Sequence, residues 1–183
     1  MTIIAPGSTI GILGGGQLGR MLSQAATQLG YRTYIYADEA SGPAADVASG
    51  WTQGAYTDED ELGRFADRVD VVTYEFENID TAAIEILSHH GLVRPNIAAL
   101  RVAQDRLAEK NFVAALGGRT APFAPVESLD DLKTALAHIG TPAILKTNRF
   151  GYDGKGQVRI NTAGEALGAW DAIGHQPSIL EGF

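Results

Sequence analysis

The sequence predicts an α/β fold in which a parallel sheet, covered by helices on both faces, precedes a smaller α+β domain. Strand and helix signals alternate as far as about residue 95, which is the pattern of a parallel sheet. Beyond residue 96 two helical segments follow one another directly, so we expect a domain boundary there, with domains over 1–97 and 98–183. No apolar run approaches the ~18 residues of a membrane span.

Apolar and β-branched runs predict the strands, and amphipathic segments that open on capping residues predict the helices. In the first domain the expected strands cover 10–13, 31–36, 69–74 and 92–93, the helices cover 18–29, 57–68 and 80–89, and 44–48 is a short strand or turn. In the second domain the helices cover 97–103, 106–116 and 128–139, the strands cover 143–146, 157–160 and 178–183, and 121–126 is an extended linker or edge strand. The last strand has no evident partner, so its exposed edge is expected to promote association.

Composition excludes several classes of protein. The chain of 183 residues has a formal net charge of −8 and contains no cysteine. Negative charge repels nucleic-acid phosphates, so nucleic-acid binding is not expected. The absence of cysteine excludes disulfides, thiolate metal sites and a cysteine nucleophile. Because no secretory signal or membrane span is evident either, we expect a cytoplasmic protein.

A glycine-rich turn follows the first strand. Gly14, Gly16 and Gly19 match the dinucleotide-binding pattern, in which N–H groups at a helix N-terminus bind phosphate. This pattern requires an acidic residue about 20 residues further on for the ribose hydroxyls, and Asp38 lies near that place. A NAD-binding oxidoreductase domain is therefore one hypothesis, although Asp38 equally suits a solvated loop.

A second glycine-rich loop lies between two predicted strands. Lys146 ends the first of these strands, and the loop that follows holds Gly151, Gly154, Lys155 and Gly156. Lysine charge and glycine N–H groups suit the phosphates of a nucleotide, but the GxxxxGK[ST] pattern is absent. On spacing alone, a β-hairpin with a long tip and two solvated lysines fits better than a nucleotide site.

Two carboxylates, Glu75 and Glu77, follow the third strand of the first domain. If the strand continues that far, alternation puts both on one face. Open α/β sheets bind ligands at the carboxyl ends of their strands, so these carboxylates and the glycine turn can meet in one crevice. A solvated pair is the alternative, and which of the two would face a ligand stays open.

Five short stretches of the sequence, in this order and spacing, match the motifs of one known enzyme family. They are 14–21 (GGGQLGRM), 73–78 (TYEFEN), 105–106 (DR), 145–146 (LK) and 151–157 (GYDGKGQ). They resemble the 5-(carboxyamino)imidazole ribonucleotide synthases, which are ATP-grasp enzymes of purine biosynthesis. The resemblance runs from about Thr9 to Phe183. It implies a Rossmann-like preATP-grasp domain followed by an incomplete α+β ATP-grasp domain.

The resemblance also implies the binding residues. ATP would be held by Arg106, Lys146, Gly151, Tyr152, Asp153, Gly154, Lys155, Gly156, Gln157, Glu181, Gly182 and Phe183. The aminoimidazole ribonucleotide would contact Gln17, Leu18, Glu75 and Tyr152. Asp38 would then have no ribose to bind. No catalytic side chain is implied, because phosphoryl transfer depends mainly on positioning and charge neutralisation.

In the implied reaction, ATP phosphorylates bicarbonate to carboxyphosphate, and this species or the carbon dioxide it releases carboxylates the exocyclic amine of the ribonucleotide. The products are 5-carboxyaminoimidazole ribonucleotide, ADP and phosphate. The magnesium ligands are expected beyond residue 183, so the chain is expected to be an N-terminal portion of the enzyme and inactive alone. A homodimer is also implied. The alternatives are a NAD-binding oxidoreductase domain and a non-catalytic nucleotide-binding module.

Overall fold

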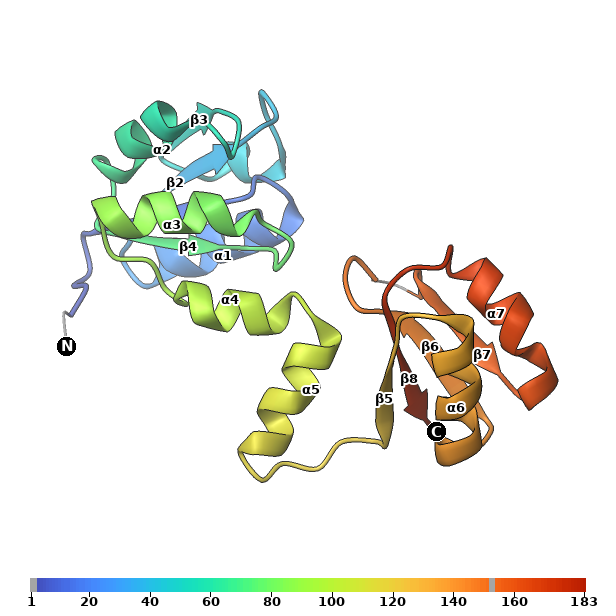
Figure 1. Ribbon diagram of the computed structural model, residues 1–183. Coiled ribbons are helices and arrows are strands. Elements are labelled where there is room, and N and C mark those ends of the chain that lie inside the picture. Colours follow the sequence, from blue (N-terminus) through green and yellow to red (C-terminus); the bar gives the residue numbers. More distant parts are fainter. Residues whose placement is uncertain (1–2, 152–153) are drawn as a thin grey trace. The chain divides into compact units, whose positions relative to one another are not determined.

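The computed structural model describes residues 3–151 and 154–183, which form two compact units. The first unit extends to Leu100 and the second begins at Arg101. Each unit has its own sheet and its own hydrophobic core (Figure 1). Among the described residues, no helix is long and apolar enough to cross a membrane.

The first unit is built on a parallel sheet with the strand order β3-β2-β1-β4. Its elements are β1 (Thr9–Leu13), α1 (Gln17–Gln28), β2 (Arg32–Ala37), a 3-10 helix (Pro43–Asp46), β3 (Gly50–Gln53), α2 (Glu59–Ala66), β4 (Val71–Tyr74) and α3 (Thr81–His90), followed by α4 (Ile97–Ala103). The parallel pairing confirms the predicted fold class. The expected strand at 92–93 is reduced to one bridge, between Val93 and Val72.

Alternate residues of the central strands form separate cores on the two faces of this sheet. Leu13 and Tyr36 belong to a core that includes residues of α2 and α3. Ile12 and Ile35 face the other way and pack with Ala44 of the 3-10 helix. Helix α1 contacts β2 and this 3-10 helix, so it covers the second face.

Helix α1 lies close to the sheet because its buried residues, Gly19, Ser23 and Ala26, are all small. A Cβ atom on Gly19 would lie 2.7 Å from the carbonyl oxygen of Gly14, a distance that real Cβ atoms essentially never show. Glycine at position 19 therefore allows the first turn of the helix to approach the preceding loop.

The register aligns the carboxyl ends of three strands. Leu13, the last residue of β1, pairs with Tyr36 of β2 on one side and with Tyr74 at the end of β4 on the other. The loops that follow β1, β2 and β4 therefore begin side by side at one edge of the sheet. This alignment brings sequence segments about 60 residues apart to one place, as ligand sites of open parallel sheets require.

The second unit contains an antiparallel sheet with the strand order β5-β8-β6-β7. Its elements are α5 (Arg106–Ala115), β5 (Phe123–Val126), α6 (Leu129–Ile139), β6 (Ala143–Thr147), β7 (Gln157–Ile160), a 3-10 helix (Ala163–Glu165), α7 (Ala166–Ala172) and β8 (Ser178–Gly182). Helices α6 and α7 cover one face of this sheet, where Leu145, Leu180 and Trp170 share a core (Figure 1).

The expectation of an exposed edge on the last strand is wrong. β8 lies inside the sheet, hydrogen-bonded to β5 on one side and to β6 on the other. The segment 121–126 supplies the covering strand. Its Pro125, opposite Ile179, is tolerated because β5 is an edge strand.

Strand β3 was not predicted. It is four residues long and is bounded by Gly50 and Gly54, so its sequence resembles a loop. The segment 44–48 just before it, expected as a short strand or turn, contains part of the 3-10 helix.

Replacing Gly19 by alanine should lower the unfolding free energy of the first unit by ~1–3 kcal/mol, because the new methyl group overlaps the Gly14 carbonyl oxygen. Gly168 in α7 is the matched control. A Cβ there meets nothing within 4 Å, so Gly168→Ala should stabilise the second unit by ~0.5–1 kcal/mol. The units carry one tryptophan each, Trp51 and Trp170, so urea unfolding followed by fluorescence in single-tryptophan backgrounds measures them separately. Stabilisation by both substitutions would contradict the close approach of α1.

Candidate functional site

A carboxylate of the protein occupies the glycine turn of the first unit. Glu75, the first residue after β4, accepts hydrogen bonds from the backbone N–H groups of Gly16, at 3.0 Å, and Gly19. Gly14 has a φ angle of 105°, and a Cβ there would overlap the Glu75 side chain. Free N–H groups at a helix N-terminus form an anion site. Here the anion is Glu75.

The two candidate carboxylates after β4 have different environments. β4 ends at Tyr74, so strand alternation does not extend to Glu77. Glu75 is half-buried against the glycine turn, whereas Glu77 is exposed and accepts a hydrogen bond from the Asn78 side chain at 3.5 Å. Gln17 and Leu18, the other residues predicted to contact the ribonucleotide, are the first two residues of α1, and both are exposed.

A hollow of about 270 Å³ lies beside the glycine turn at the carboxyl edge of the parallel sheet. Its lining includes the carboxylates of Asp38, Glu39, Glu75 and Asp80 and the side chain of Tyr56. Burial, and then the negative charges of Asp38, Glu39 and Glu75, raise the pKa of the Tyr56 hydroxyl. A hollow with this charge favours a ligand group rich in hydrogen-bond donors and repels phosphate.

Three charged side chains converge in the second unit. The Nζ atom of Lys146 lies 2.8 Å from one carboxylate oxygen of Glu181, and the Nζ atom of Lys110 lies 3.5 Å from the other. Strand alternation places Lys146 and Glu181 on the sheet face opposite α6 and α7. Burial raises the pKa of Glu181, but the hydrogen bond and charge of Lys146 and the charge of Lys110 outweigh burial and hold the pKa below its usual value.

These side chains line a hollow of about 330 Å³ that suits phosphate. The lining residues are Arg106, Glu109, Lys110, Val113, Thr120, Lys146 and Glu181. The three cations outnumber the two carboxylates, so the net charge favours an anionic ligand. Lys110 was not predicted from the sequence. Its i, i+4 spacing from Arg106 places both side chains on one face of α5, and this spacing is the signal that could have identified it.

The second glycine loop is anchored next to this hollow. The Arg106 guanidinium donates a hydrogen bond to the carbonyl oxygen of Gly151, at 2.7 Å. The Gly156 carbonyl oxygen accepts one from the Thr147 N–H group, at 2.8 Å. Gly154 and Gly156 have φ angles of 80° and 65°, which favour glycine. The start and end of the loop are thus fixed to α5 and β6.

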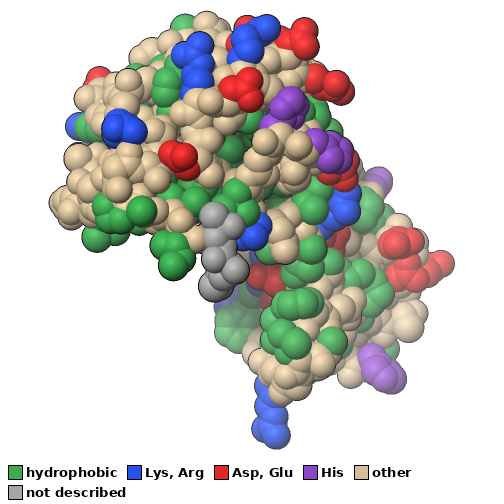
Figure 2. Space-filling model, turned by 90° about the vertical axis from the view of Figure 1, so that its left-hand side faces the viewer, with side chains coloured by type: hydrophobic (Ala, Val, Ile, Leu, Met, Phe, Trp, Pro, Cys, Tyr) green, Lys and Arg blue, Asp and Glu red, His purple; other side chains and the backbone are tan. Residues whose placement is uncertain are grey.

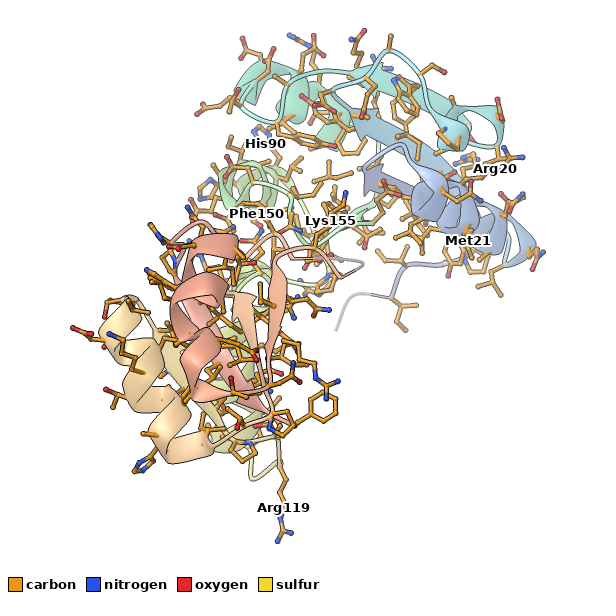
Figure 3. All side chains as sticks on the ribbon, turned by 90° about the vertical axis from the view of Figure 1, so that its right-hand side faces the viewer. Arg20, Met21, His90, Arg119, Phe150 and Lys155 are labelled. Carbon is orange, nitrogen blue, oxygen red and sulfur yellow. The ribbon has the colours of Figure 1, made fainter. Side chains whose placement is uncertain are left out.

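The other residues predicted to bind ATP are less enclosed. Lys155 and Gln157 are exposed, and Lys155 is labelled on the loop in Figure 3. Gly182 ends β8, and the Phe183 ring is exposed with the Arg159 guanidinium 4.6 Å from its centroid. Two predicted residues lie outside the described part of the chain: Tyr152 and Asp153.

A further hollow of about 410 Å³ lies at the base of the glycine loop. Its lining residues are Asp105, Thr147, Asn148, Arg149, Phe150, Gly156, Gln176 and Pro177. The side-chain oxygen of Asn148 is buried there without a hydrogen-bond partner. Sequence reasoning missed this asparagine, because no pattern distinguishes it from an ordinary loop residue.

No group of three or more histidine, aspartate and glutamate side chains within residues 3–151 and 154–183 is arranged to hold a metal ion. Acidic and basic side chains are interspersed over the face shown in Figure 2. Charges of one sign predominate in the linings of two hollows: carboxylates in the hollow of the first unit and cations in the 330 Å³ hollow of the second.

Comparison with known proteins identifies both parts of the chain. A family model described as the ribonucleotide synthetase preATP-grasp domain matches residues 7–104, and an ATP-grasp domain model matches residues 111–183. The N5-carboxyaminoimidazole ribonucleotide synthase of Brucella melitensis is 48% identical over 184 aligned residues, which cover 100% of this chain and 51% of the relative.

Solved structures agree with this assignment. An ADP complex of an N5-carboxyaminoimidazole ribonucleotide synthetase superposes with a TM-score of 0.92 at 38% identity, covering 99% of this chain and 48% of that one. The Aspergillus clavatus N5-carboxyaminoimidazole synthase, in complex with ADP and 5-aminoimidazole ribonucleotide, superposes with a TM-score of 0.81 at 26% identity. The superposition covers 96% of this chain and 46% of that one. The chain thus spans about half the length of these relatives. It belongs to the ribonucleotide synthetase preATP-grasp family, with an ATP-grasp domain from residue 111 onward.

Proposed function

We propose that this chain provides the ribonucleotide-binding and ATP-binding units of an ATP-dependent carboxylase of purine biosynthesis. The proposed reaction joins bicarbonate to the exocyclic amine of 5-aminoimidazole ribonucleotide. The observation that carries the proposal is the convergence of Arg106, Lys110 and Lys146 on one hollow beside a glycine loop. The names of the relatives, and a related structure that holds ADP and the aminoimidazole ribonucleotide, support it.

The second unit binds ATP in this proposal. Its cationic hollow neutralises phosphate charge, and the glycines of the loop 151–157 let backbone N–H groups approach the phosphate oxygens. Glu181 holds the Lys146 ammonium group in place before ATP arrives, at 2.8 Å. Because the ammonium group is already in position, less free energy is lost to rearranging the side chain when phosphate binds. The loop, Arg106 and the end of β8 at Glu181–Phe183 complete the proposed ATP site.

The first unit binds the aminoimidazole ribonucleotide in this proposal. An amine attached to an imidazole supplies N–H donors, and the acidic hollow beside the glycine turn supplies acceptors. Glu75 is the acceptor next to the turn, and Gln17 and Leu18 adjoin it at the start of α1. Because Glu75 already occupies the anion site of the turn, neither the ribonucleotide phosphate nor the pyrophosphate of NAD is assigned to it. The NAD hypothesis is therefore not retained.

Carboxylation requires activated bicarbonate, because bicarbonate itself is a poor electrophile. The γ-phosphoryl group of ATP is transferred to a bicarbonate oxygen, which gives ADP and carboxyphosphate. The amine nitrogen then bonds to the carboxyl carbon, directly or after release of carbon dioxide, and phosphate and a proton leave. The residues of this chain contribute charge neutralisation and positioning to the phosphoryl step.

The described residues do not fit a magnesium site. No three or more of the described histidines and carboxylates are grouped to hold a metal ion, and Glu181 is already paired with two lysines. No step is therefore assigned to a metal held by these residues.

We propose that the 183-residue polypeptide alone binds ATP without turning it over. We also propose that the protein is cytoplasmic and that it forms a homodimer.

Replacing Lys146 by methionine should weaken ATP binding by about one to two orders of magnitude, because a charge-assisted hydrogen bond to phosphate contributes ~1.5–3 kcal/mol. Lys133→Met is the matched control, since Lys133 pairs with Asp130 on the surface of α6, where both side chains are exposed. Isothermal titration calorimetry with ATP measures both variants. Equal affinities for ATP in the two variants would contradict the proposed ATP site.

The stability of the second unit should depend on pH through Glu181. Its folded pKa lies below the ordinary value of 4.5, so folding favours the ionised form. This contribution is fully present above the unfolded pKa and is lost as the pH falls through the lower folded pKa. From about pH 6 to about pH 3, the unfolding free energy measured with Trp170 fluorescence should fall more steeply in the wild type than in Glu181→Gln. Parallel pH profiles of the two proteins would show that Glu181 does not have this role.

A further inference from the structure

A carboxylate lies inside the cationic hollow of the second unit, where the proposed function places ATP. The Glu181 side chain is only 12% exposed, and each of its two oxygens faces a different ammonium group. The Nζ atom of Lys146 lies 2.8 Å from one oxygen, and the Nζ atom of Lys110 lies 3.5 Å from the other. Because a carboxylate repels phosphate, an anionic side chain in a phosphate site requires a compensating cation.

Lys110 is fixed against Glu181 by the fold. Helix α5 has no buried residue, yet the Lys110 side chain is only 16% exposed. Its Nζ atom lies 5.6 Å from the centroid of the Phe123 ring, on β5. Phe123 pairs with Glu181 in the register of β5 and β8. An aromatic face and a carboxylate both attract an ammonium group, so two neighbouring side chains of the protein hold Lys110 in place.

Phosphate binding changes which charges in the hollow are paired. An ammonium group has three donors, so Lys146 can bind phosphate while it stays bonded to Glu181. Phosphate and carboxylate would then be two anions that share one cation in an enclosed site, where like charges repel strongly. Arg106, the third cation of the hollow, is directed to the glycine loop through its hydrogen bond to the Gly151 carbonyl oxygen. Lys110 is therefore the cation that can neutralise Glu181.

We propose that Lys110 is a positioning residue of the ATP site: its ammonium group neutralises the Glu181 carboxylate and so leaves the charge of Lys146 available to phosphate. This role rests on the proposed function, because it assumes that the hollow binds ATP. Lys110 acts through Glu181 and does not itself contact phosphate. Burial raises the pKa of Glu181, but the hydrogen bond and charge of Lys146 and then the charge of Lys110 hold it below its usual value. Without Lys110, the carboxylate would either repel phosphate or become protonated and hold Lys146 less firmly.

Isothermal titration calorimetry with ATP on a double-mutant cycle tests this role. Lys110→Met should weaken ATP binding ~10-fold in the wild-type background, because it leaves Glu181 without its second cation. In the Glu181→Gln background there is no carboxylate charge to neutralise, so Lys110→Met should change the affinity by less than ~2-fold. Equal losses in the two backgrounds, or no loss in either, would overturn the proposal. Lys133→Met, which removes an exposed lysine of α6, should bind ATP like the wild type.

A measurement on the wild type covers the case in which Lys110→Met folds poorly. The ¹³C signal of the Glu181 carboxyl group, assigned by its loss in Glu181→Gln, reports the pKa of this group with ATP bound. This pKa should stay below the ordinary value of 4.5, because Lys110 remains paired with the carboxylate. A rise above 4.5 on ATP binding would overturn the proposal. A wild type that does not bind ATP would contradict the proposed function as well, whereas any other contrary result would contradict the role of Lys110 alone.

Discussion

The contact between Glu75 and the glycine turn organises the ligand-binding edge of the first unit. One carboxylate accepts hydrogen bonds from the N–H groups of Gly16 and Gly19 and so joins the end of β4 to the start of α1. This contact requires glycine at positions 14 and 19, where a Cβ would meet Glu75 or the Gly14 carbonyl oxygen. It also satisfies donors that would otherwise bind an external anion. As a result, a turn whose sequence resembles a phosphate-binding turn forms one side of an acidic hollow.

In the second unit the central carboxylate is surrounded by cations, whereas in the first unit it lies among other carboxylates. Glu181 is buried between Lys146 and Lys110, and these lysines with Arg106 leave the hollow with an excess of positive charge. The two units thus present complementary chemistries: acceptors for a donor-rich ligand in the first, and cations for phosphate in the second. This division explains why a glycine-rich turn and a glycine-rich loop in one chain need not bind the same group.

The sequence predicted the parallel sheet and most helices, because apolar periodicity and capping residues are local signals, and it allowed 121–126, which contains β5, to be either a linker or an edge strand. It missed β3, which is bounded by glycines. It predicted the strand β8 but wrongly expected an exposed edge there, because the partners of β8 are far away in the sequence. For the site, strand ends correctly predicted that Glu75 meets the glycine turn. That its carboxylate would fill the anion site depends on a β1–β4 register that no local pattern encodes. Lys110 was also missed: its i, i+4 spacing from Arg106 could have placed it on the same face of α5, but its pairing with Glu181 depends on the tertiary fold.

The most direct test follows backbone amide signals of the ¹⁵N-labelled chain by NMR during titration with ATP and, separately, with NADH. ATP should shift the signals of Lys146, Gly156 and Glu181 and leave those of Gly16 and Gly19 in place, because Glu75 holds these two N–H groups. NADH should leave the Gly16 and Gly19 signals unchanged as well. Saturable shifts of Gly16 and Gly19 with either nucleotide would show that the turn binds phosphate and would contradict the account.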